Sequence, residues 1–288
     1  MAKSGGVTAR NTRQGFRSEY IARYFFSAFG TAVEVSQGND IGIDILCNLT
    51  KFNGLLITVK SSYGVQVKSS DDAFTYAGKQ ATTWLSNLEY PLLLTSVDKK
   101  NSRIKIYSAW NINRFLLSLN SDDEQTFPEE IKFITSNDEE LGEPNINGTI
   151  PVGKPILDFE FSDIDDPDKS ENYFNVLEEW LEIDNRNYLL RRSGVSCAFG
   201  YTKWETNRSP KEFHVWYKPY FYSPHHANKI KQLLAEAFVP LGLYTKASSD
   251  GGQIQHFKTE FNDLKTFVDK YLRDKMDDFS KGVFENEL

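Results

Sequence analysis

An aspartate stands inside a strongly β-forming run in the first third of the chain. Asp44 lies between Ile43 and Ile45, and aspartate is depleted in strands and costly to bury without a partner. A second β-forming run carries Gln66 and Lys68, whose side chains share one face because residues two apart in a strand point the same way. A carboxylate, an amide oxygen and an ammonium group on one sheet edge predict a hard-oxygen metal site of the kind that binds Mg²⁺.

The segments around this run alternate between helix and strand signals. Gln14–Phe29 has apolar residues at helical spacing and is followed by Gly30, which predicts a helix. A second helix is predicted over Phe74–Leu88, and a turn at Asp98–Asn101. Strands are predicted at Val33–Val35, Ile43–Leu49, Leu55–Val59, Val65–Val67, Pro91–Val97 and Arg103–Tyr107. Residues 1–120 are therefore expected to form an α/β domain.

Charge is distributed very unevenly along the 288 residues. The formal net charge is −7, but it divides into +6 over residues 1–120, −16 over 121–190 and +3 over 191–288. The acidic block also concentrates prolines, so residues 121–189 are predicted to be a connector with short strands at Ile131–Ile134 and Ile156–Phe161. A solvated linker is the simplest interpretation; a DNA-mimicking or autoinhibitory segment over the basic domain is the alternative.

Residues 190–288 are predicted to form a smaller α+β domain for recognition or oligomerisation. Ser223 and Pro224 open a helix that runs to Val239, and a last helix follows Asn262. Strands are predicted at Phe213–Tyr222, Leu243–Lys246 and Gln253–Lys258. The aromatic residues of 213–222 suit a strand core or partner interface, with base stacking as the alternative.

Composition narrows the class further. A content of 40% hydrophobic and 25% charged residues is that of a globular protein. No run approaches the roughly 18 apolar residues of a membrane span, and the polar N-terminus lacks a secretory signal. Two cysteines cannot form a disulfide framework or a cysteine-rich zinc site. A soluble cytoplasmic protein without membrane contact is expected.

Four motifs occur in a characteristic order. Glu19 lies on the first helix, and the strand motifs are Asp40-Ile41-Gly42-Ile43-Asp44, Val65-Gln66-Val67-Lys68-Ser69 and Tyr90-Pro91-Leu92-Leu93-Leu94-Thr95-Ser96-Val97-Asp98. Over residues 12–110 this pattern resembles the PD-(D/E)XK nuclease superfamily. The branch with Mrr-type restriction enzymes and prokaryotic defence proteins is the most similar.

The resemblance implies a restriction-endonuclease-like core, a mixed sheet flanked by helices, and Mg²⁺-dependent hydrolysis of phosphodiester bonds in DNA. Asp44 and Gln66 would ligate Mg²⁺, or Mn²⁺ as a substitute, with a backbone carbonyl near Val67. Glu19 would bind the metal or one of its waters, and Lys68 would orient the attacking water or stabilise developing charge. Asp40 is assigned to a turn or to the surroundings of the site. Phosphate contacts are predicted at Arg13, Arg17, Arg23, Lys60 and Lys79.

Two questions stay open at this point. Leu56–Ser62 almost duplicates the third motif, so Lys60 is an alternative to Lys68, although Thr58 would then replace Gln66 as ligand. An endonuclease in restriction or anti-phage defence, acting alone, as a homodimer or with a defence-system partner, is the leading function. The alternatives are an inactive module of the same fold that binds nucleic acid or protein, and an RNA endonuclease.

Overall fold

The computed structural model describes residues 5–35, 42–70, 73–119, 127–192 and 197–217, with scattered residues between 231 and 281. The chain divides into two compact units. The first comprises Met1–Leu189 and Cys197–Lys218, and the second comprises Leu190–Ser196 and Pro219–Leu288.

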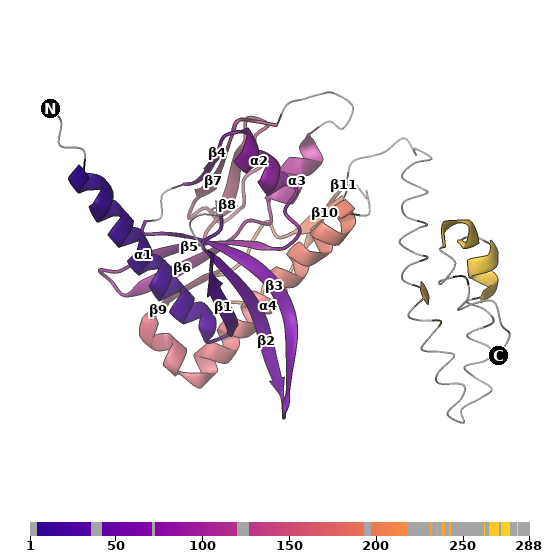
Figure 1. The fold of residues 1–288 in the computed structure, drawn as a ribbon, viewed down its shortest axis with the longest axis horizontal. Coiled ribbons are helices and arrows are strands. Elements are labelled where there is room, and N and C mark those ends of the chain that lie inside the picture. Colours follow the sequence, from indigo (N-terminus) through magenta and orange to yellow (C-terminus); the bar gives the residue numbers. More distant parts are fainter. Residues whose placement is uncertain are drawn as a thin grey trace. The chain divides into compact units, whose positions relative to one another are not determined.

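A six-stranded mixed sheet forms the centre of the first unit (Figure 1). Its strand order is β1-β2-β3-β5-β6-β9, and β3 and β5 are parallel while the other neighbours are antiparallel. The strands are β1 Gly30–Glu34, β2 Ile45–Asn53, β3 Leu56–Lys68, β5 Leu92–Asp98, β6 Arg103–Ser108 and β9 Leu157–Glu160. This mixed sheet with helices confirms the α/β class.

Two long helices help to cover one face of this sheet. They are α1, Gly5–Ser27, and α4, Pro167–Arg192. Phe25 of α1 stacks on Phe159 of β9 at 4.2 Å between ring centroids, and Trp180 of α4 is 1% exposed in the same core. The predicted helix over Gln14–Phe29 corresponds to α1 and is confirmed there.

The opposite face carries a second core under a smaller sheet. This three-stranded sheet has the order β4-β7-β8, with β4 Phe74–Ala77, β7 Glu130–Thr135 and β8 Thr149–Gly153. The short helices α2, Lys79–Ser86, and α3, Ile112–Ser118, contribute to the same core. Strand β5 lies between the two cores, and its residues 92–97 are all buried.

The hairpin of β2 and β3 extends past the neighbouring strands (Figure 1). The sequence predicts two strands at Leu55–Val59 and Val65–Val67, but β3 is continuous because β2 pairs along it from Asn53 to Ile45. A register shift opposite Leu49 and Thr50 makes Lys60 an extra residue of β3, a β-bulge. Apolar side chains at the tip are exposed, namely Phe52, Leu55, Leu56, Ile57 and Val59.

Residues 127–189, expected to be part of an acidic connector, belong to the first unit. Strand β9 pairs with β6, and α4 buries an apolar stripe that includes Tyr173, Val176, Leu177, Trp180 and Leu181. Acidic residues such as Asp168, Glu171 and Glu182 are exposed on the same helix, while the buried Asp184 accepts a hydrogen bond from Asn113, so high negative charge and burial coexist. Two short strands were predicted in this segment, and β7 and β9 confirm them.

The predicted helix over Phe74–Leu88 is corrected by the structure. Phe74–Ala77 is β4, which pairs with β7, and the helix begins only at Lys79 after Gly78. The reason is a pairing with a strand more than fifty residues later, which local periodicity does not contain. Cys197–Lys218 also belongs to the first unit rather than to the C-terminal domain, and it forms β10 Cys197–Gly200 and β11 His214–Tyr217.

The described residues of the second unit are mainly helical. Its buried residues Ala235, Val268, Leu272 and Met276 form a small apolar cluster. Residues 265–270 are helical, as predicted, followed by the 3₁₀ turn η3, Arg273–Lys275. The strands predicted at Leu243–Lys246 and Gln253–Lys258 lie outside the described residues. No helix in the described part of the chain is long and apolar enough to cross a membrane.

Candidate metal and phosphodiester site

Asp44 is fixed to strand β3 at two points. Its backbone N–H donates to the Val65 carbonyl at 2.9 Å, and its Oδ2 accepts from the Val67 N–H at 2.6 Å. Pairing of β2 with β3 begins at Ile45 opposite Val65, so the edge of β3 beyond that pair lacks a strand neighbour on this side. The Asp44 carboxylate takes the next ladder position, which explains why an aspartate stands in a β-forming run.

Two further oxygen atoms belong to β3 at Val67, which binds this carboxylate, and at the residue before it. The N–H and C=O of one residue in a strand point to the same side, so the Val67 carbonyl faces the Asp44 side. The Oε1 atom of Gln66 is buried and accepts no hydrogen bond from the residues that the structure describes. A buried acceptor without a donor costs free energy unless a cation, a water or a substrate group satisfies it.

Lys68 is held on the opposite side of β3 from Val67. Its Nζ donates to the Ala73 carbonyl at 2.5 Å and lies 5.3 Å from the centroid of the Phe74 ring. The side chain is half-buried, with its ammonium group at the start of β4. Lys60, the alternative lysine, forms an ion pair with Glu178 of α4 at 3.3 Å. Of the two lysines, Lys68 is the one adjacent to the Asp44–Val67 hydrogen bond, because it directly follows Val67 in β3.

Glu19 lies on α1, on the other face of the sheet from Gln66. It lines a hollow of about 100 Å³ with Arg23, Glu34 and Ile45 among its neighbours, and Ile45 directly follows Asp44. No group of three or more His, Cys, Asp and Glu side chains suited to a metal is found among the described residues. A metal at Asp44 would thus depend on the amide oxygen of Gln66, backbone oxygen and water. Asp40 lies outside the described residues.

The predicted phosphate contacts differ in their surroundings. Arg17 is exposed on α1 near Lys99, whose pKa is lowered by desolvation and by the Arg17 charge. Lys79 is exposed at the start of α2, whereas Arg23 pairs with Glu34 at 3.5 Å. Lys60 is paired as described above, and the side chain of Arg13 lies outside the described part of α1.

A hollow of about 630 Å³ adjoins the end of β3. It is lined by Ser69, Ser70, Ser96, Asp98, Asn101, Arg103, Lys105 and Asp158. Ser96 is the register partner of Lys68, so the hollow continues from the motif strand across β5 to β6. Arg103 forms an ion pair with Asp158 at 2.5 Å. The pKa of Asp98 is lowered, first by a hydrogen bond from the side chain of Asn101 and then by one from the Asn101 backbone. No sequence motif singles out Arg103 or Lys105, although their strand follows the Asp98 turn directly.

Comparisons of the chain with family models, with curated proteins and with solved structures found no match.

Proposed function

We propose that the protein is a Mg²⁺-dependent endonuclease that hydrolyses phosphodiester bonds of DNA. Two observations carry the proposal: the Asp44 carboxylate accepts a hydrogen bond from the Val67 N–H, and the buried Oε1 of the preceding Gln66 has no donor among the described residues. The setting in restriction or anti-phage defence rests on the motif resemblance alone.

The donor set fits a hard divalent cation. Asp44, Gln66 and the Val67 carbonyl would hold Mg²⁺ or Mn²⁺, and Glu19, which lies on the other face of the sheet, is not part of this donor set. When bound, such a metal polarises a phosphate and lowers the pKa of its water. Lys68 would leave the Ala73 carbonyl to steady the charge that develops on the phosphate.

Charge near the site agrees with a polyanionic substrate. Residues 1–120 carry a net charge of +6, and Arg17, Lys99 and Lys105 lie around the β5–β6 turn or its neighbouring helix. Contacts of this kind bind nucleic acid with a strong dependence on salt.

The test is cleavage of supercoiled plasmid by the full chain with Mg²⁺, with Mn²⁺ and with EDTA. Asp44→Asn and Lys68→Ala should each lower the rate at least about 100-fold. Asp138→Asn and Lys211→Ala are matched controls, because both side chains are exposed and outside the site. Equal rates for the wild type and the two site variants would remove the catalytic assignment. RNA offered in the same assay separates a DNA nuclease from an RNA nuclease.

A nuclease-fold module that binds without cutting is the second candidate. It is favoured by the fact that Asp44 and Lys68 both have structural partners, the Val67 N–H and the Ala73 carbonyl. This function predicts salt-sensitive binding that needs no divalent metal and survives Asp44→Asn. Filter binding in EDTA over a salt series distinguishes it from the enzyme.

A further inference from the structure

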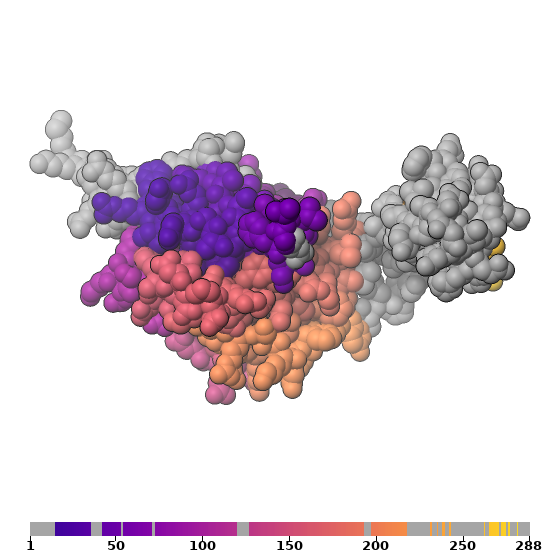
Figure 2. All heavy atoms as spheres, turned by 90° about the horizontal axis from the view of Figure 1, so that it is seen from below, coloured from indigo at the N-terminus to yellow at the C-terminus, as the bar shows by residue number. Residues whose placement is uncertain are grey.

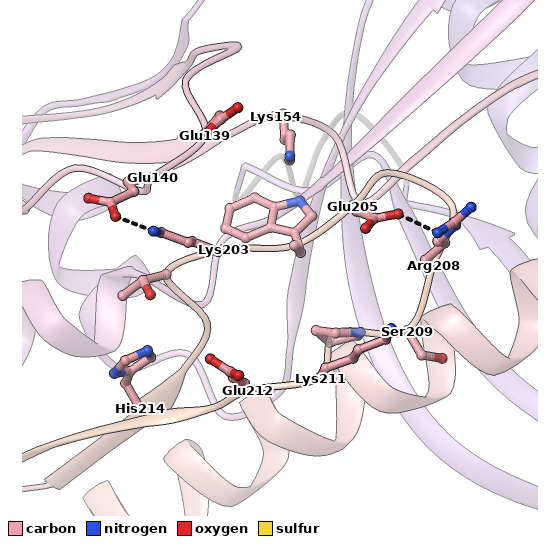
Figure 3. A pocket seen from close by; sticks show the side chains of 13 residues that line it. Glu139, Glu140, Lys154, Lys203, Glu205, Arg208, Ser209, Lys211, Glu212 and His214 are labelled. Atoms are coloured by element: carbon pink, nitrogen blue, oxygen red, sulfur yellow. Dashed lines mark ion pairs between the residues drawn. The ribbon is translucent and has the colours of Figure 1, made fainter.

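A second hollow of about 600 Å³ lies in the first unit and shares no residue with α1, β2 or β3 (Figure 3). Its lining consists of Glu139, Glu140, Lys154, Thr202, Lys203, Trp204, Glu205, Arg208, Ser209, Pro210, Lys211, Glu212 and His214. Most of these belong to the connection between β10 and β11, which is coloured orange and is exposed on the face shown in Figure 2. The volume falls within the range of small-molecule sites.

The connection between β10 and β11 is irregular but firmly anchored. Asn207, with φ 62°, exchanges two 2.7 Å hydrogen bonds with the backbone of Asp158: Oδ1 accepts from its N–H and Nδ2 donates to its carbonyl. Its own N–H donates to Ile156, and its carbonyl accepts from Nδ2 of Asn172, both at 2.9 Å. A long segment without regular structure, held in this way, provides a preformed wall.

Trp204 forms the fixed base of the hollow. Its ring lies 5.2 Å from that of Trp180 at 78°, and it is 7% exposed. It also covers Gly153, where a Cβ atom would lie 2.7 Å from the indole. The indole N–H donates to the Pro155 carbonyl at 3.4 Å. The ring position is therefore set by the core and not by a ligand.

The charges are divided between the two sides of this ring (Figure 3). On one side, Lys203 forms an ion pair with Glu140 at 2.5 Å. This pairing is the main cause that raises the pKa of Lys203, and the charges of Glu139 and Glu212 raise it further. Three carboxylates and one ammonium group give this side a net charge of −2. His214 lies on the same side.

The other side of the ring is basic. Arg208 pairs with Glu205 at 2.5 Å, while Lys154 and Lys211 have no carboxylate partner within the described residues. Three cations and one carboxylate give a net charge of +2. The hollow is thus neutral as a whole and strongly dipolar across the ring.

We propose that this hollow binds a short peptide with free termini, placing its ammonium group near Glu139 and Glu212 and its carboxylate near Lys154 and Lys211. A polyanion would meet the three carboxylates on one side, and an ion of single charge would satisfy only one half. The volume exceeds that of one amino acid and accommodates about two or three residues. This site is independent of the proposed nuclease function.

The test is isothermal titration of the full chain with trialanine, N-acetyl-trialanine and trialanine amide. The free peptide should bind about three- to tenfold more tightly than either blocked form, and more weakly as salt rises. Equal affinity for all three, absence of binding up to about 10 mM, or tighter binding of adenosine monophosphate would overturn the proposal.

Variants assign the two ends. Lys154→Met and Lys211→Met should lower the affinity for the free peptide to that for the amide and leave binding of the amide unchanged. Glu212→Gln should lower the affinity for the free peptide to that for N-acetyl-trialanine and leave binding of N-acetyl-trialanine unchanged. Lys100→Met and Glu89→Gln, both exposed and outside the hollow, are the controls. Thermal unfolding of each variant checks that the fold is intact, and loss of all three ligands to the same degree would contradict the assignment.

Discussion

The carboxylate of Asp44 accepts a 2.6 Å hydrogen bond from the backbone N–H of Val67, across 23 residues of sequence. This one bond joins the start of β2 to the strand segment that carries Gln66 and Lys68. Asp44 therefore supports the sheet edge in addition to its proposed role as a metal ligand, and the two roles can be tested separately.

Asp44→Ala is expected to lower the free energy of unfolding by about 1–2 kcal/mol, because it leaves the Val67 N–H without its acceptor. Asp44→Asn keeps an acceptor oxygen and should retain most of that stability while losing cleavage. Urea unfolding of both variants beside Asp138→Asn measures the difference. Equal stability of the alanine and asparagine variants would show that the hydrogen bond contributes little.

Gln66→Leu is expected to leave stability unchanged or raise it by up to about 1 kcal/mol. The buried Oε1 has no donor among the described residues, so its removal abolishes a desolvation cost. The same change should slow cleavage and raise the Mg²⁺ concentration that it requires, whereas Gln66→Glu should bind Mg²⁺ more tightly. Unfolding in EDTA and metal titration of the rate test the two effects separately. A large loss of stability in the leucine variant would mean that the amide has a structural partner.

Gly200→Ala should destabilise the first unit by about 3 kcal/mol or more. A Cβ atom at this position of β10 would lie 2.0 Å from the ring of Trp110, which is 1% exposed and packed 5.5 Å from Trp216. Gly15→Ala is the contrasting change, since its Cβ would have ordinary contacts in a helix and should add about 0.5–1 kcal/mol. Melting temperatures of the two variants should move in opposite directions.

Cys47 should resist thiol reagents in the folded protein. Burial is the main cause that raises its pKa to about 12. In a Cys197→Ser background, a disulfide reagent at pH 8 should label Cys47 only after denaturant is added. Because the unfolded thiol titrates near pH 8.5, this contribution to stability is present below that pH and is lost as the pH rises toward 12. Rapid labelling of the native protein would contradict this.

Asp163 should contribute to stability at neutral pH and not in acid. Its hydrogen bond from Lys169, at 2.6 Å, is the main cause that lowers its pKa, with further donors at Glu160 and Tyr173. A lowered folded pKa gives stability that is present above the ordinary value near 4 and lost as the pH falls through the folded value. Asp163→Asn should therefore cost about 1 kcal/mol at pH 7 and almost nothing at pH 2. Urea titrations at the two pH values, with Asp138→Asn as control, give the difference.

Helix α4 lies in the acidic segment that was predicted to be a connector, although its sequence contains helix signals. Pro167 stands at the first helical position, and Tyr173, Val176, Leu177, Trp180 and Leu181 follow at helical spacing. The high negative charge of this segment favoured the prediction of a solvated connector. Charge on one side of a helix is, however, compatible with a buried apolar stripe on the other side. The burial of this helix follows its periodicity and not its composition.

The sequence by itself determined the elements that local pattern encodes: α1, the main strands of the central sheet, and the placing of Gln66 and Lys68 on one face. Tertiary structure decided what depends on distant partners. It made Phe74–Ala77 a strand by pairing it with β7, brought α4 against the sheet, and set Asp44 against Val67. It also assembled the dipolar hollow around Trp204 from segments sixty residues apart. Apolar residues spaced by two or by 3.6 positions can be recognised in the sequence itself. Pairing between strands tens of residues apart depends on which surfaces are buried together, and this is seen only in the tertiary structure.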